Sequence, residues 1–241
     1  GEPQHIRDLY GLANGTTAGF GRQCLLARCM VESGVRHTLL VHGVQITSTS
    51  WDDHGDVKGG MIRHCSEVDR PVAGLLADLK QRGLLDETLV VWASEMGRTP
   101  FVNGTLGKTP GREHNSWALV MWMAGGNVRG GARAGATDEF GLRAAEAQIP
   151  IRDVHATILD LMGLDDHQLR YMHANRLSEL TNIRGEVLTE LIAGRGTTAP
   201  RVGDHSSQLA RFPRPCVSPS STLQWTSVRP CRNSLRSDRC V

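Results

Sequence analysis

The sequence predicts an α/β fold, because short apolar runs of strand length alternate with longer segments in which apolar residues recur at helical spacing. Hydrophobic residues make up 39% of the 241 residues, which is enough for a substantial core. No apolar run reaches the roughly 18 residues that a membrane-spanning helix needs, so we expect no membrane span.

The first part of the chain predicts a helix and then a strand. Residues 18–33 carry apolar side chains at helical spacing, and Gly34 follows as a stop signal. Residues 35–41 (VRHTLLV) form a compact apolar run with β-branched side chains, which favours a buried strand. The polar segment 47–60 is predicted to be a loop.

A second, longer helix is predicted next. Apolar residues between positions 62 and 79 follow one face of a helix that ends at Gly83. Pro71 lies within this pattern and predicts a kink or a break between two helices, because proline removes one backbone hydrogen bond.

Two further apolar runs predict strands, residues 88–93 (TLVVWA) and residues 117–124 (WALVMWMA). They are separated by a Gly- and Pro-rich segment, residues 96–116, which predicts a loop. The order of these helices and strands is that of an α/β sheet.

The last predicted elements are short helices. Asp153 precedes an apolar segment that ends at Gly163, so we interpret Asp153 as an N-cap or first-turn acid of a short helix. Asp153 and His155 are both interpreted as structural residues. Residues 187–192 predict one more short helix.

Residues 194–241 differ in composition from the rest of the chain. They are rich in Ser, Arg and Pro, contain no Lys and show no sustained period, so we expect disorder. The abrupt change favours a frameshifted translation or an unrelated terminal extension over a nucleic-acid or membrane tail. We therefore divide the chain into a domain, residues 1–193, and a tail.

The formal net charge of +2 comes from this tail. After residue 195 there are seven Arg and two acidic residues, whereas residues 1–195 carry 20 basic and 23 acidic residues. Because the body of the chain is mildly acidic and has no basic cluster, we expect no nucleic-acid partner.

The six cysteines form no Cys-x-x-Cys pair, which argues against a zinc ribbon. Cys24, Cys29 and Cys65 lie in the predicted helices, where a buried structural thiol is the expected role.

Acidic and histidine side chains gather just beyond the predicted strands. Asp52 and His54 lie in the loop after the first strand, Glu95 follows the second, and His114 lies in the next loop. Because open α/β sheets bind ligands at the carboxyl ends of their strands, we expect these four side chains to converge. Carboxylates and imidazoles are ligands of divalent ions, so the sequence predicts a split metal site that leaves Zn, Ca and Mg open.

Arg98 lies three residues beyond Glu95 and is the candidate for binding a sulfate or phosphate group, because its planar guanidinium matches a tetrahedral oxyanion. The alternative is an ion pair with Glu95 or Asp53.

Other classes of site have less support. The Gly-x-Ser-x-Gly elbow of serine hydrolases is absent. Residues 125–131 (GGNVRGG) lack the Gly-x-Gly-x-x-Gly spacing of dinucleotide-binding loops and predict a turn. A binding protein that keeps these loops without turnover remains an alternative to an enzyme.

Linked motifs run in order through about residues 1–193 of the chain. They are GEPQHIRDLYGL, GRQCLLARCMVESGVR, WDDHG, EVDRPVAGLLADLKQRGLLDETLVVWASEMGRTP, GREH, MWMAGGNVRGG, GATDEFG and DVHATILDLMGLD. Together they resemble the DUF1501 family, sulfatase-like proteins of the alkaline phosphatase superfamily. This resemblance implies an alkaline phosphatase-like α/β/α sandwich that hydrolyses sulfate or phosphate esters of small molecules or saccharides.

The resemblance also assigns ligands. It implies that Asp52, His54 and His114 hold one ion, and that Glu95 and Met96 stand where the superfamily has an Asp-His pair for a second ion. A thioether is a poor ligand for a hard divalent ion, so we expect the second site to be weak or absent.

The superfamily's nucleophile and an early metal-binding Asp are located near the start of the full-length domain. The present chain is expected to be the C-terminal part of that domain, incomplete at the N-terminus and inactive alone. The resemblance implies an exported protein, periplasmic or extracellular, and a non-catalytic binding relative of the same fold is the alternative.

We predict that limited proteolysis removes residues 200–241 before it cuts the body, because the tail lacks the apolar content that offsets the entropy of ordering. Mass spectrometry of the fragments measures the order of cleavage. Cuts in the body while residues 200–241 stay intact would show that the tail is a folded part of the protein.

Overall fold

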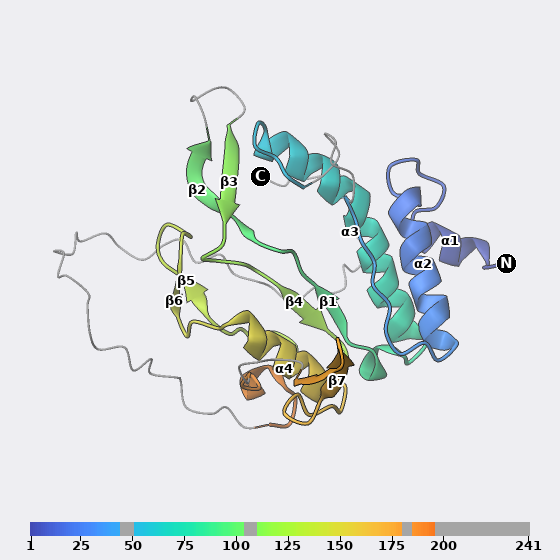
Figure 1. Cartoon of the computed structure of the whole chain (residues 1–241). Helices are drawn as coiled ribbons and strands as arrows, with labels where there is room; N and C mark the ends of the chain where they lie inside the picture. The colour runs from blue at the N-terminus through green and yellow to red at the C-terminus, as the bar shows by residue number, and fades with distance from the viewer. Residues whose placement is uncertain (44–50, 104–109, 180–184, 196–241) are drawn as a thin grey trace, which may run out of the picture.

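The computed structural model describes residues 1–43, 51–103, 110–179 and 185–195 (Figure 1). It contains helices and small antiparallel sheets, which is an α/β protein in the general sense. The helices are α1 (Gln4–Leu9), α2 (Ala18–Glu32), α3 (Val57–Gln81) and α4 (Ile151–Leu161), with 3-10 turns η1 (Leu85–Glu87) and η2 (Thr189–Leu191). The strands are β1 (Val90–Trp92), β2 (Gly97–Asn103), β3 (Gly111–Asn115), β4 (Trp122–Ala124), β5 (Ala136–Thr137), β6 (Ala144–Glu146), β7 (Arg170–His173) and β8 (Arg176–Glu179).

The principal apolar core lies where α1, α2 and α3 pack together. Its buried residues come from all three helices: Ile6, Tyr10, Phe20, Cys24, Val68, Leu75 and Leu79. Burial of Cys24 raises the pKa of its thiol to about 12, which agrees with the structural role predicted for it.

Helix α3 starts and ends at clear signals. The Asp56 carboxylate accepts a hydrogen bond from the Gly59 amide at 2.9 Å and so caps the helix, and Gly83 follows its last turn with a φ of 70°. Pro71 is buried inside a helix that runs without a break, so the alternative of two separate helices was wrong.

Strands β1 and β4 form an antiparallel ladder that runs between α3 and α4 (Figure 1). Val90 and Trp92 of β1 pack against the helical core, and the Trp92 and Trp122 rings stack with centroids 6.2 Å apart. The strand predicted at 88–93 is therefore confirmed, although its partner runs antiparallel to it.

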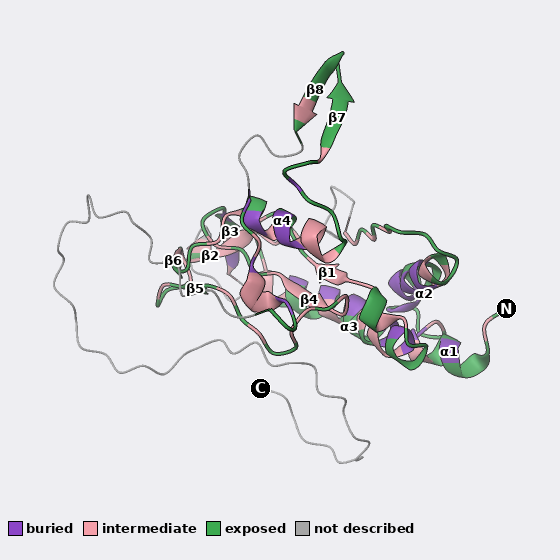
Figure 2. Cartoon of the chain, turned by 90° about the horizontal axis from the view of Figure 1, so that it is seen from below, coloured by how far each residue is buried: buried purple, intermediate pink, exposed green. Residues whose placement is uncertain are grey.

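The remaining strands form hairpins, β2 with β3, β5 with β6 and β7 with β8. The β7–β8 hairpin stands away from the rest of the molecule and is mostly exposed (Figure 2). The prediction of a loop for residues 96–116 was wrong, because β2 and β3 form there. The Gly and Pro residues of this segment lower its strand propensity but do not prevent a hairpin.

Two strand predictions failed wholly or in part. Residues 35–41 adopt no strand, and Leu39 and Val41 are 76% and 50% exposed. Of residues 117–124, only the last three pair, while Trp117 is 64% exposed. An apolar run becomes a strand only where a neighbouring segment pairs with its backbone over several residues, and the Trp117 carbonyl has only an isolated bond, from the Ala144 amide at 3.1 Å.

Helix α4 is held against the last described segment of the chain. Asp153, in its first turn, is buried and accepts a hydrogen bond from the Glu186 amide at 3.0 Å. The Thr157 hydroxyl accepts one from the Leu188 amide at 2.9 Å. The structural role predicted for Asp153 is confirmed, and His155 is exposed on the same helix. The helix predicted at 187–192 is only the 3-10 turn η2.

A buried ionic cluster ties the three N-terminal helices together. Asp78 of α3 accepts hydrogen bonds from Arg28 at 2.9 Å, from Tyr10 at 3.0 Å and from Arg82 at 2.7 Å. Although burial raises the pKa of Asp78, the bonds from Arg82 and Tyr10 and the charge of Arg28 hold it below the ordinary carboxyl value. Asp78 is therefore ionised throughout the neutral range.

The described helices include none with the length and apolar character needed to cross a membrane. The prediction for the tail lies outside the described residues, since the structure describes nothing beyond Arg195.

We predict that Asp78→Ala lowers the free energy of unfolding by about 3 kcal/mol, because a buried charge pair is broken while Arg28 keeps its ion pairs with Glu2 and Glu32. Urea unfolding measures the loss, and Asp69→Ala, at an exposed position of α3, is the control. Because the folded-state pKa of Asp78 is lowered, its contribution should disappear as the pH falls below about 4. A loss that persists unchanged at low pH would contradict this account.

Candidate metal centre

The β2–β3 hairpin supplies two of the side chains predicted for the site. Arg98 of β2 pairs with His114 of β3 in the strand register. Residues directly opposite each other in an antiparallel pair lie on the same face of the hairpin. Arg98 and His114 therefore reach the same side, although both lie in the segment that was predicted to be one long loop.

The loop before α3 supplies the other side chains and is attached to the start of β3. The Arg112 amide donates to the Asp53 carbonyl at 3.4 Å, and the Val57 amide donates to the Pro110 carbonyl at 3.4 Å. The loop folds back on itself at His54, whose amide donates to the Asp52 carbonyl at 3.1 Å. These backbone bonds bring Asp52 and His54 beside the hairpin.

Gly111 makes this close approach possible. A Cβ atom at this position would collide with the His54 carbonyl group and with the amide nitrogen of Gly55. These obstacles are backbone atoms, which cannot move aside as a flexible side chain could. The first position of β3 therefore requires glycine if the loop is to lie where it does.

One oxygen of Asp52 is the meeting point of the site. Its Oδ1 atom lies 2.9 Å from His54 Nε2 and 2.8 Å from His114 Nε2. Arg98 donates to the same oxygen at 2.7 Å. The donor atoms of Asp52, His54 and His114 all lie within 4.8 Å of one another, a spacing at which one ion can be held.

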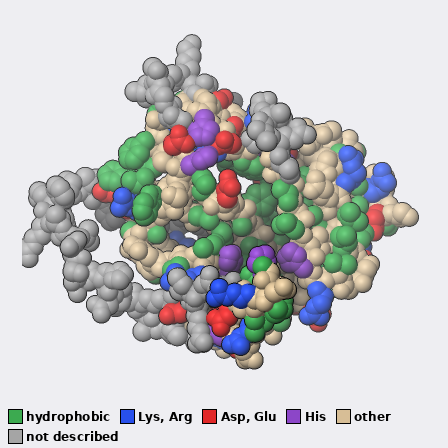
Figure 3. Space-filling view, in the orientation of Figure 1, with side chains coloured by type: hydrophobic (Ala, Val, Ile, Leu, Met, Phe, Trp, Pro, Cys, Tyr) green, Lys and Arg blue, Asp and Glu red, His purple; other side chains and the backbone are tan. Residues whose placement is uncertain are grey.

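The surroundings of Asp52 favour its ionised form. Its pKa is lowered to about 2 by the hydrogen bond with His114 and then by the one from Arg98. The Asp52 side chain is 50% exposed, so the site is open to solvent. Figure 3 shows histidine and acidic side chains on the surface near the β2–β3 end of the molecule.

Glu113 is a member of the site that the sequence analysis did not select. Its Oε1 atom lies 3.5 Å from His54 Nδ1 and accepts a hydrogen bond from the His114 amide at 2.9 Å. A carboxylate at Nδ1 can accept the ring proton there when Nε2 gives its lone pair to a cation, which is the state that a metal ligand needs. Its position next to His114 was the only sequence signal for this role.

The structure does not bring Glu95 to this group. Glu95 is exposed just after β1, and the three donor atoms that lie together in the described structure do not include its carboxylate. Met96 follows it at the start of β2. The donor atoms of the Asp52 group are thus those of one ion, and Glu95 and Met96 are not among them.

Arg98 forms its ion pair with Asp52, whereas Glu95 and Asp53 were the partners considered from the sequence. It also donates to the Trp51 carbonyl at 2.9 Å and to the Arg112 carbonyl at 3.2 Å. These bonds connect the loop to both strands of the hairpin.

A second group of potential ligands lies nearby, made of His42, His64 and Glu67. This group was not predicted from the sequence, although His64 and Glu67 are three residues apart on a helix and so lie on one face. His42 lies at the end of an apolar run, where no sequence pattern marked it.

Comparison with known proteins identifies one family. A family described as a protein of unknown function (DUF1501) matches residues 1–192. No curated protein and no solved structure matches the chain.

We predict that the Asp52 carboxyl titrates with a midpoint near pH 2, and that His114→Ala and Arg98→Gln each move the midpoint upward. Each substitution removes a hydrogen bond that favours the ionised carboxylate, so protonation becomes easier. Carbon-detected NMR of the side-chain carboxyl measures the midpoint, with Asp86→Asn, an exposed position in η1, as the control. A midpoint that stays near pH 2 in both variants would mean that these contacts do not hold Asp52.

Proposed function

The chain belongs to the DUF1501 family, whose function is unknown, and we propose from its site that it is a metal-dependent hydrolase-like protein acting on sulfate or phosphate esters. The proposal includes the fold that goes with this chemistry, an alkaline phosphatase-like α/β/α sandwich of which the β1–β4 ladder between α3 and α4 would be a part (Figure 1). The observation that carries it is the convergence of Asp52, His54 and His114.

The donor set fits a divalent ion. One carboxylate and two imidazoles are ligands that zinc accepts, and a site with three protein ligands leaves a position open for substrate. The His54 ring has a carboxylate, Glu113, behind it, as metal-bound histidines usually do. A bound ion would supply Lewis-acid polarisation of an ester oxygen.

Arg98 is the residue of this chain that we assign to the anionic group of the ester. Its guanidinium lies against Asp52, within the same group of side chains, and is 26% exposed. When the charge of Asp52 is shared with a cation, the attraction that holds Arg98 to it weakens, and the planar guanidinium can turn to a sulfate or phosphate oxygen.

The second candidate is a binding protein of the same fold that does not turn its ligand over. It is favoured because the Asp52 group gathers donors for one ion without Glu95, whereas two-metal hydrolases hold two ions about 3.5–4 Å apart. Ester binding is common to both candidates, and turnover distinguishes them.

We predict that the protein binds one Zn²⁺ ion per chain, measured by isothermal titration and elemental analysis. Glu113→Gln should weaken binding by about 10- to 100-fold, as the loss of a partner behind a metal ligand does, and His54→Ala or His114→Ala should weaken it further. His155→Ala, at an exposed position on α4, is the matched control. Unchanged binding in His54→Ala would contradict the assignment.

The test of function uses p-nitrophenyl phosphate and p-nitrophenyl sulfate with the Zn²⁺-loaded protein. Retention of either ester, weakened by Arg98→Gln, is expected for both candidates. Turnover that His54→Ala abolishes identifies a hydrolase, and retention without turnover identifies the binding protein. A Zn²⁺-loaded protein that retains neither ester would overturn both.

A further inference from the structure

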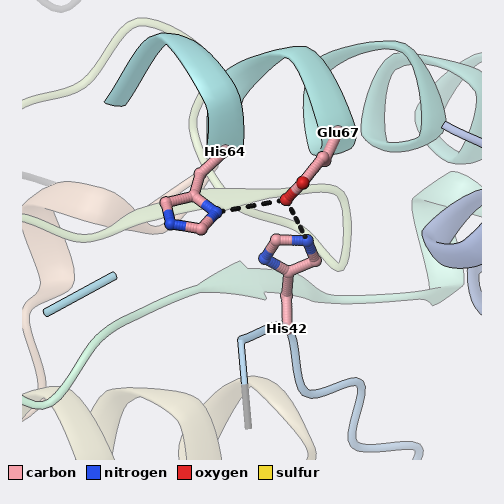
Figure 4. A group of neighbouring side chains, drawn as sticks. All are labelled: His42, His64 and Glu67. Atoms are coloured by element: carbon pink, nitrogen blue, oxygen red, sulfur yellow. Dashed lines mark hydrogen bonds and ion pairs between the residues drawn. The ribbon is translucent and has the colours of Figure 1, made fainter. Parts of the chain in front are cut away.

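His42, His64 and Glu67 form a second cluster that has the composition of a metal site (Figure 4). Glu67 Oε2 lies 3.1 Å from His42 Nε2 and 3.1 Å from His64 Nδ1. His64 is completely buried, and the other two side chains are half-buried. Two imidazoles around one carboxylate oxygen are also the arrangement of the Asp52 group, so the surroundings must distinguish the two clusters.

The far nitrogens of these imidazoles face hydrogen-bond donors. The Trp51 indole N–H donates to His42 Nδ1 at 2.9 Å, and Arg63 donates to His64 Nε2 at 3.3 Å. An indole and a guanidinium can only donate, so both ring nitrogens must be acceptors. The protons of the neutral rings are then on His42 Nε2 and His64 Nδ1, which both point at Glu67.

This arrangement leaves the Glu67 side of the rings without lone pairs for a cation. A metal ion at His42 Nε2 would displace its proton to Nδ1, where it would face the Trp51 N–H, and two donors would then oppose each other. Burial lowers the pKa of His42, with the neighbouring His64 acting in the same direction against the opposing effect of Glu67, so the neutral ring is favoured. In the Asp52 group the far nitrogen of His54 faces an acceptor, Glu113, which is the opposite situation.

The cluster holds Trp51 on two sides. The Trp51 ring donates to His42 and stacks on the His64 ring with centroids 4.7 Å apart. The next residue is Asp52, and the Trp51 carbonyl accepts from the same Arg98 nitrogen that binds Asp52. The placement of the Trp51 ring therefore fixes one end of the loop that presents the Asp52 carboxylate.

We propose that His42, His64 and Glu67 are a positioning network that binds no metal ion and that fixes Trp51, and through it Asp52 and Arg98. Glu67 orients both imidazoles, and the imidazoles orient the indole. The part that concerns Asp52 deepens the proposed metal site and rests on it, whereas the protonation of the two rings stands independently of that function.

The first test is long-range ¹H–¹⁵N NMR of the imidazoles in the full chain, with His42→Asn and His64→Asn used for assignment. We expect a proton on Nε2 of His42 and on Nδ1 of His64. For His64 this is the less common tautomer of a free histidine. One equivalent of Zn²⁺ should shift the signals of His54 and His114 and leave these two tautomers in place. Zn²⁺ that removes the proton from His42 Nε2 or His64 Nδ1 would overturn the proposal.

Variants at Glu67 test the positioning role. Glu67→Gln keeps an acceptor oxygen but removes a charged metal ligand, so it should preserve both tautomers. Glu67→Ala removes the acceptor, and we expect at least a tenfold faster exchange of the Trp51 indole proton, shifted His54 and His114 signals and about tenfold weaker Zn²⁺ binding. Glu146→Ala, at an exposed position of β6, is the control.

These experiments distinguish failure of the proposed metal site from failure of the positioning network. If no variant and no wild-type protein binds Zn²⁺, the proposed function fails, while the tautomers and the indole exchange still decide the positioning network. If Glu67→Ala does not fold, Trp51→Phe keeps the stacked ring without its N–H, and we expect it to shift the His54 and His114 signals because the loop before Asp52 loses its bond to His42. His54 and His114 signals that are unchanged in Trp51→Phe would contradict the proposal.

Discussion

The Oδ1 atom of Asp52 accepts from a guanidinium and contacts two imidazoles, and the geometry of the site depends on this one oxygen. Its partners come from three segments of the chain: His54 lies in the same loop as Asp52, Arg98 lies in β2 and His114 lies in β3. A single carboxylate can hold such a group only if it stays ionised, and its lowered pKa ensures that it does. The same charge that joins these partners gives the site its affinity for cations.

Two clusters of two histidines and one carboxylate are connected through Trp51 and Asp52, and the neighbours of the far nitrogens of His54 and His42 are of opposite kinds. A carboxylate behind His54 can accept the ring proton at Nδ1 when Nε2 binds a cation, whereas an indole behind His42 keeps a proton on Nε2. Counting histidines and acids within a sphere would rank the clusters equally. Only the direction of each hydrogen bond distinguishes a ligand set from a positioning network.

Helix α3 connects the stability of the fold to the site. Its C-terminal half carries Asp78, which contacts the N-terminal helices. Its N-terminal half carries His64 and Glu67, and also Gly59, whose amide donates to the capping residue Asp56. One helix therefore connects the ionic cluster to the loop that ends at Asp56. Removing one partner of a buried charge pair leaves an uncompensated charge, so the position of this helix depends on the whole cluster.

Local sequence patterns were enough to predict the residue types of the site and the helices with regular apolar spacing, such as residues 18–33 and 62–79, because this spacing specifies which face is apolar. They also placed Asp52, His54 and His114 together, but for a reason that the structure corrects: residues 35–41 form no strand, and β1 and β4 are antiparallel, so the side chains meet at a hairpin. Strand pairing, the approach of Gly111 to His54 and the direction of the bonds around His42 depend on contacts between distant segments. Only the tertiary structure could decide them, because no local pattern encodes which backbone lies beside which.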